Sequence, residues 1–178
     1  MSKKYKNNSD IKLAVVGGDI RQLWLARALS GDGYQVAVYG FGDNVNQTVH
    51  FSEIIIGGAE RCSRLSDALR LCDAAILPLP YSSDGQRVNC PLGGEIALPD
   101  IFSGTERGTL ILGGRLDDNA KKLAQPAGMI LEDYFEREEI CVANDMLEKN
   151  QTGKKTLFYL IYYTMLCLRY NQNYMFIL

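Results

Sequence analysis

The fold is decided by residues 11–39, which read IKLAVVGGDIRQLWLARALSGDGYQVAVY. A short apolar run at residues 11–16 ends at a pair of glycines, as expected for a strand of a parallel sheet that is buried on both faces. Asp19 is a natural N-cap for the helix that follows, in which apolar residues recur at helical spacing. A second strand follows at residues 34–39. This order predicts a βαβ unit with a right-handed crossover.

The same order of elements recurs downstream. We expect strands at residues 74–77, 109–112 and 129–131, and helices at residues 63–71, 117–125 (closed by Pro126) and 134–139. Between them, residues 81–94 are rich in Ser, Asp, Gly and Asn and read as a loop. Residues 53–56 fit either a strand or a buried part of a long connection. The alternation predicts a doubly wound, mostly parallel α/β sheet, a Rossmann-like or flavodoxin-like three-layer sandwich.

Length and composition fit one globular domain. The chain has 178 residues, of which 47% are hydrophobic and 22% charged. Its formal net charge is -2, so we expect no nucleic-acid binding, which normally requires a basic surface.

The reactive residue types show no recognisable catalytic or metal-binding pattern. The five cysteines form no CxxC pair, and with one histidine we expect neither a disulfide framework nor a metal site. That histidine, His50, has no nucleophile motif beside it and is interpreted as a packing or solvated residue. Because the polar N-terminus lacks the apolar stretch of a secretory signal, we expect a cytoplasmic protein.

Three regions are predicted along the chain: a disordered N-terminal extension at residues 1–10, an α/β domain at residues 11–145 and an atypical aromatic tail at residues 146–178. The apolar core of the tail, residues 157–168, is shorter than the roughly 20 residues that a membrane-spanning helix needs, so a membrane anchor is the lesser alternative.

A ligand site is expected beyond the carboxyl ends of the strands, because open α/β sheets bind ligands where the winding direction reverses. The candidate binding residues follow three of the predicted strands and are Gly17, Gly18, Asp19, Arg21, Gln22, Pro78, Pro80, Gly113 and Gly114. No catalytic residue is identified.

The first glycine turn does not match the dinucleotide fingerprint GxGxxG, since Asp19 and Gln22 stand where its second and third glycines would be. An acidic N-cap also repels a phosphate from the helix N-terminus. Two uses of Arg21 remain open: bidentate capture of a carboxylate, or a structural ion pair with Asp19 or Asp43.

Three motifs resemble the A subunit of dipicolinate synthase over roughly residues 11–144. They are AVVGGDIRQL at residues 14–23, DAAILPLP at residues 73–80 and FEREEI at residues 135–140. The resemblance implies part of a two-domain oxidoreductase of spore-forming bacteria. There, the A and B subunits together make dipicolinic acid, a small dicarboxylate, from a dihydrodipicolinate-type intermediate. It also implies that NAD(P) binds in a second, C-terminal domain, while the N-terminal domain closes over the substrate.

The chain departs from this family after residue 144. The family continues into a Pro-Thr-x-Glu-Gly helix that leads to the cofactor domain, whereas residues 145–150 read DMLEKN and the aromatic tail follows. We therefore expect a chain truncated before the cofactor domain, by a shifted reading frame or by design, and inactive alone.

Three hypotheses follow: a substrate-side oxidoreductase domain, a stand-alone small-anion or nucleotide-binding module without catalysis, and a residual gene product whose tail drives association.

Overall fold

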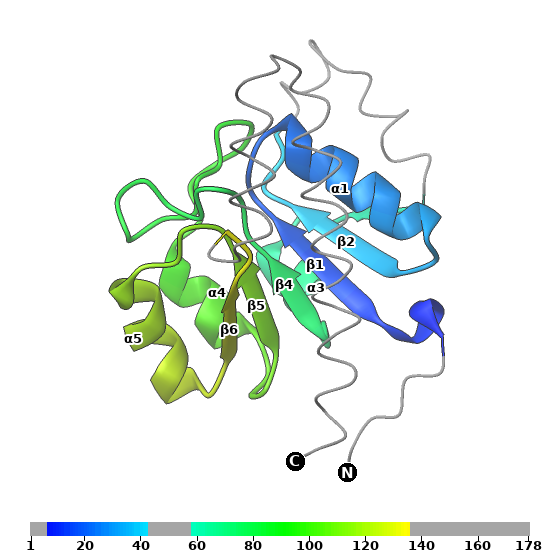
Figure 1. The fold of residues 1–178 in the computed structure, drawn as a ribbon. Helices are drawn as coiled ribbons and strands as arrows, with labels where there is room; N and C mark the ends of the chain where they lie inside the picture. The colour runs from blue at the N-terminus through cyan, green and yellow to red at the C-terminus, as the bar shows by residue number, and fades with distance from the viewer. Residues whose placement is uncertain (1–6, 43–57, 136–178) are drawn as a thin grey trace.

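A computed structural model describes residues 7–42 and 58–135. Within these residues, six strands form one parallel sheet in the order β3-β2-β1-β4-β5-β6 (Figure 1). The winding direction reverses between β1 and β4, as in Rossmann-type sheets. The predicted doubly wound α/β class is confirmed.

The element bounds are as follows. The strands are β1 (Lys12–Val16), β2 (Gln35–Tyr39), β3 (Glu60–Arg61), β4 (Ala74–Ile76), β5 (Leu110–Gly113) and β6 (Ile130–Asp133). The helices are α1 (Ile20–Gly31), α3 (Leu65–Leu69), α4 (Leu98–Gly104) and α5 (Asp118–Ala127), with a 3-10 turn η1 (Asn8–Asp10) before β1.

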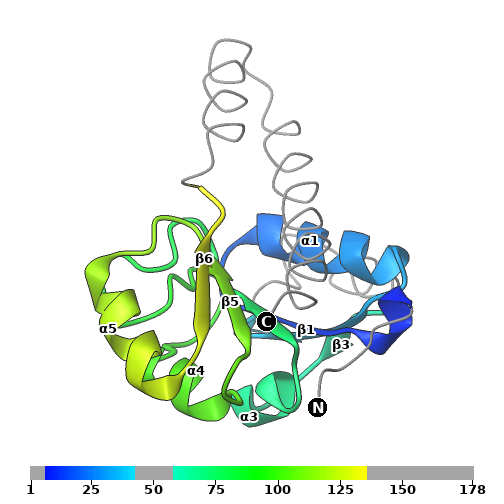
Figure 2. The ribbon, with the colours of Figure 1, turned by 60° about the horizontal axis from the view of Figure 1, so that its bottom comes forward.

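Both faces of the sheet are buried at β1, which explains the apolar run of residues 13–16 that follows the exposed Lys12. Leu13 and Val15 pack with α1 on one face, whereas Ala14 and Val16 pack on the other face with α3, α4 and α5. These four side chains are at most 1% exposed. Figure 2 shows α1 and the group α3, α4 and α5 on opposite sides of the sheet. Side chains of successive strand residues alternate between faces, so a strand between two helix layers must be apolar throughout.

The helix ends test the predicted caps. The Asp19 carboxylate accepts a hydrogen bond from the Arg21 amide at 2.9 Å, so the predicted N-cap of α1 is confirmed. The prediction that Pro126 closes the helix of residues 117–125 is wrong, because Pro126 lies inside α5. The proline sits in the final turn, and the helix ends at Gly128 in the left-handed conformation (φ 69).

Three short elements were not predicted. Helix α4 has only seven residues, too few for its apolar residues to show a helical period. Strand β3 consists of two exposed residues, so its sequence has no apolar pattern that would predict a strand. The turn η1 lies within the extension predicted to be disordered, where the Ser9 carbonyl accepts from Gln35 Nε2 at 2.6 Å.

Some expectations fall outside the described residues: the nature of residues 53–56, His50 and Asp43, the aromatic tail, and all but the start of the helix expected at residues 134–139.

Candidate functional site

The predicted site residues meet at the carboxyl edge of the sheet, around the reversal between β1 and β4. A Cβ atom added to Gly18 would lie 3.1 Å from Pro78 Cβ, so the turn after β1 contacts the segment after β4. The Gly114 amide, after β5, donates to the Pro78 carbonyl at 3.2 Å. The structure thus brings the three strand ends together.

Most of these residues lie beneath the surface. Asp19, Arg21 and Pro80 are partly exposed, whereas the other six are buried: Gly17, Gly18, Gln22, Pro78, Gly113 and Gly114. A ligand could therefore contact only three of the nine predicted residues directly.

The backbone N–H groups of Gly17 and Gly18 already donate hydrogen bonds within the domain. Gly17 donates to the Tyr39 carbonyl at 2.9 Å and Gly18 to the Asn89 carbonyl at 2.8 Å. Both glycines have positive φ angles (69 and 95), and a Cβ on Gly17 would lie 2.7 Å from Val88 Cγ1. A pyrophosphate needs open backbone and free N–H groups at this position. The residues at this turn do not fit a dinucleotide.

Asp19 and Arg21 form an ion pair at the mouth of this turn. Arg21 donates to the Asp19 carboxylate from Nε at 2.9 Å and from Nη2 at 2.8 Å, and Nη2 also donates to the Leu79 carbonyl at 3.1 Å. Burial acts to raise the pKa of Asp19, but hydrogen bonds and charge from Arg21 outweigh it and leave that pKa below its usual value. Of the two uses predicted for Arg21, the structure shows the pair with Asp19. Among the described residues, Nη1 has no hydrogen-bond partner, and the side chain is 39% exposed.

Gln22 is the unusual residue of the site. It is 2% exposed, and within the described part of the chain neither Nε2 nor Oε1 has a hydrogen-bond partner. Its Cγ lies directly against Gly18, where a Cβ would collide with it. A buried polar group without a partner costs about 1–3 kcal/mol, so such a group in a native structure requires an explanation.

The hydroxyl groups of two tyrosines hold the other strand ends, although neither tyrosine stands in the predicted set of binding residues. Tyr81 donates from its hydroxyl to Asp117 Oδ1 at 2.6 Å, and Tyr134 donates to the Leu77 carbonyl at 3.1 Å. Burial raises the pKa of both phenols. Tyr81 follows the proline segment directly, which was the one signal available in the sequence; its partner Asp117 is 36 residues away.

Residues 82–97, which we call the covering segment, lie over the carboxyl ends of β1 and β2. The Gly42 amide donates to the Leu92 carbonyl at 2.8 Å, and the Cys90 thiol donates to the Gly40 carbonyl at 2.8 Å. Burial raises the pKa of this thiol.

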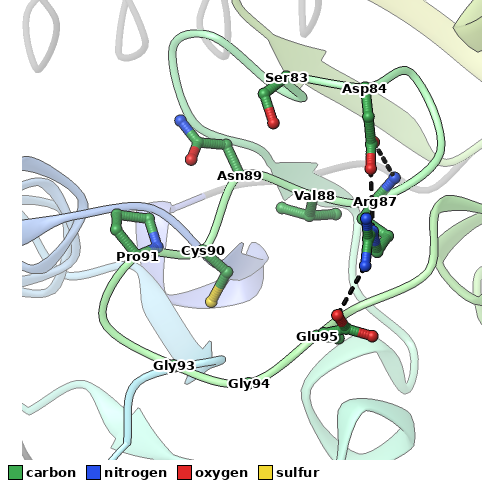
Figure 3. Close-up of a pocket in the computed structure, with 10 residues that line it drawn as sticks. All are labelled: Ser83, Asp84, Arg87, Val88, Asn89, Cys90, Pro91, Gly93, Gly94 and Glu95. Atoms are coloured by element: carbon green, nitrogen blue, oxygen red, sulfur yellow. Dashed lines mark hydrogen bonds and ion pairs between the residues drawn. The ribbon is translucent and has the colours of Figure 1, made fainter.

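A hollow of about 290 Å³ opens in the covering segment (Figure 3). Arg87 on its wall is paired with Asp84 at 2.9 Å and with Glu95 at 2.6 Å. Its charge is thus balanced within the hollow.

The described residues hold neither a metal-binding cluster nor a membrane-spanning helix. In the described ranges no three His, Cys, Asp or Glu side chains gather in a way that could hold a metal ion. None of the helices described there is long and apolar enough to cross a bilayer.

The described residues form a Rossmann-like α/β domain. Its strand order reverses between β1 and β4, and polar groups gather at the carboxyl edge beside that reversal. Residues 12–135 match the family described as the N-terminal domain of the dipicolinate synthase A subunit, and the chain belongs to this family. The resemblance to this family is thereby confirmed; the match contains the first two motifs and ends at residue 135, where the third begins.

Solved structures agree with this assignment. Dipicolinate synthase A chain from Bacillus subtilis is 25% identical, with a TM-score of 0.61 over 80% of this chain and 49% of that chain. The dipicolinate synthase A subunit from Bacillus halodurans is 19% identical, with a TM-score of 0.61 over 83% of this chain and 50% of that chain. The chain therefore spans about half the length of these relatives. Among curated protein sequences none matches this chain.

Proposed function

We propose that this chain is the substrate-side domain of a dipicolinate synthase-like oxidoreductase, which forms dipicolinic acid from a dihydrodipicolinate-type intermediate in the cytoplasm of a sporulating cell. Family membership supports the class of enzyme. The observation that carries the role of this domain lies at the β1 and β4 edge, where Arg21 Nη1 and the Gln22 carboxamide have no hydrogen-bond partner among the described residues.

A carboxylate is the ligand group that these side chains suit best. A guanidinium nitrogen and an amide nitrogen both donate hydrogen bonds, and a carboxylate only accepts them. Arg21 is partly exposed and can meet a ligand directly, whereas Gln22 is 2% exposed and would reach a ligand only after the residues that cover it moved.

The cofactor belongs elsewhere in this proposal. Because the Gly17 and Gly18 amides are engaged and Asp19 caps α1, we place NAD(P) in a second domain, of the kind that the other half of the longer relatives could supply. The chain alone would then bind substrate without turning it over. The family description, which names one subunit of a synthase, also makes the B subunit of dipicolinate synthase a candidate partner.

Calorimetric titration of the 178-residue chain with pyridine-2,6-dicarboxylate and with NADPH tests this proposal. We expect the dicarboxylate to bind and Arg21→Ala to weaken it by roughly tenfold or more, the effect of losing one charge-assisted hydrogen bond. Arg107→Ala is the matched control, because Arg107 is exposed and precedes β5 at the opposite edge. Binding of NADPH without the dicarboxylate would favour the stand-alone nucleotide-binding module instead.

A further inference from the structure

Tyr81 connects four parts of the carboxyl edge. It is 2% exposed, its amide donates to the Gly114 carbonyl at 2.9 Å, and its carbonyl accepts from the Asn89 amide at 2.9 Å. Its hydroxyl donates to Asp117 at 2.6 Å. Through its side chain and backbone, Tyr81 thus joins its own segment after β4 to Gly114 after β5, to the covering segment and to the start of α5.

Two short paths lead from Tyr81 to the candidate site. Leu79, two residues earlier, offers its carbonyl to Arg21 Nη2 at 3.1 Å. Asn89, bonded to Tyr81, offers its own carbonyl to the Gly18 amide at 2.8 Å. A shift of Tyr81 would therefore move the groups that orient Arg21 and the turn beneath Gln22.

Asp117 gives this arrangement a rigid anchor. Its Oδ1 also accepts from the Asn119 and Ala120 amides at 2.9 and 3.0 Å, which fixes the carboxylate at the N-terminus of α5. The hydrogen bond from Tyr81 is the largest factor that holds the pKa of Asp117 below its usual value. The bond therefore joins a neutral hydroxyl to an ionised carboxylate, the stronger kind of hydrogen bond.

We propose that Tyr81, held by Asp117, is a positioning residue for the carboxylate-binding side chain Arg21 and for the glycine turn beneath Gln22. The part of this inference that concerns ligand affinity rests on the function proposed above. Tyr81 itself touches no ligand and acts through Leu79 and Asn89.

Amide hydrogen exchange of the full chain, read by NMR, tests the positioning directly. In Tyr81→Phe we expect the Gly18 and Asn89 amides to exchange about tenfold faster than in the wild type, as loss of one charge-assisted hydrogen bond allows. The Leu77 amide, bonded to the Leu112 carbonyl at 2.7 Å inside the sheet, should keep its rate. If all three amides accelerate alike, Tyr81 only stabilises the fold and the proposal fails.

Two substitutions at Asp117 separate the bond from the helix cap. Asp117→Asn keeps a neutral acceptor and a cap, so its exchange should lie between the wild type and Tyr81→Phe, whereas Asp117→Ser keeps the cap but is too short to reach Tyr81 and should reproduce the effect of Tyr81→Phe. Asp117→Ser also serves if Tyr81→Phe does not fold. Equal rates in both Asp117 variants would overturn the proposal.

Titration with pyridine-2,6-dicarboxylate gives the second readout. We expect Tyr81→Phe to weaken binding about five- to tenfold. If the wild-type chain does not bind the dicarboxylate, the proposed function fails, while hydrogen exchange still decides the role of Tyr81. If the wild type binds and Tyr81→Phe binds equally well, the positioning role fails and the proposed function stands.

Discussion

Replacing Gln22 by methionine should stabilise this protein, although Gln22 lies in a predicted binding site. Gln22 is 2% exposed and its two amide atoms have no partner among the described residues. Methionine has a similar length and flexibility, a comparable helix propensity and no strong hydrogen-bonding atom to leave unsatisfied. Removal of an unsatisfied buried amide should raise the free energy of unfolding by about 1–3 kcal/mol.

Urea denaturation followed by circular dichroism measures this effect. With a slope of about 1–3 kcal/mol per molar urea for a small protein, the midpoint of Gln22→Met should rise by roughly 0.3–3 M. Gln125→Met is the control, because Gln125 is an exposed residue of α5, where a substitution should change stability by no more than about 0.5 kcal/mol.

The ligand assay completes the reasoning. The same Gln22→Met chain should bind pyridine-2,6-dicarboxylate more weakly, because the proposed function makes the Gln22 carboxamide a donor to the ligand. A lower urea midpoint for Gln22→Met would show that the carboxamide is satisfied in the folded protein, and the argument built on its missing partner would fall.

Two further predictions concern Gly114 and Asp19, which belong to the same predicted set of site residues. In Gly114→Ala the new Cβ would lie 2.9 Å from both Leu79 Cβ and Tyr134 Cε2, so thermal denaturation should show a loss of about 1–3 kcal/mol, whereas Gly94→Ala, with no atom within 4 Å, should change little. The pKa of Asp19 is lower in the folded chain than its ordinary value, so its contribution is present above about pH 4 and lost as the pH falls through the folded pKa. The stability difference between the wild type and Asp19→Asn should therefore shrink on acidification, and a constant difference would exclude that linkage.

Local patterns predicted most of the framework. The apolar run of β1, the Asp19 cap and the glycines after β1 and β5 lie where the sequence placed them, because each depends on residues close together in the chain. The cover over the first glycine turn could not be predicted in this way. Val88 and Asn89 reach Gly17 and Gly18 across about seventy residues, from a segment without periodicity.

The candidate site shows the same limit. Sequence reasoning selected Arg21 and Gln22 by residue type and by their place after β1, and the structure does bring them to the reversal of the sheet. The sequence left open whether Arg21 pairs with Asp19, and it held no sign that Gln22 is buried, since burial depends on what packs over α1. The hydrogen bond between Tyr81 and Asp117 joins two loops 36 residues apart and has no local signal at all.

The charge balance at the start of α1 supports the kind of ligand that the proposed function assigns to this edge. The positive end of the helix is occupied by the chain's own carboxylate, Asp19, and the Gly17 and Gly18 amides are already hydrogen-bonded, which disfavours a phosphate there. Asp19 also accepts from Nε and Nη2 of Arg21, and among the described residues only Nη1 of this side chain has no acceptor. A multiply charged pyrophosphate would need several such donors, whereas one oxygen of a small carboxylate needs one donor from Arg21 and a second from an amide such as that of Gln22. Under the proposed function, the ion pair between Asp19 and Arg21 would therefore favour a small acid over a dinucleotide.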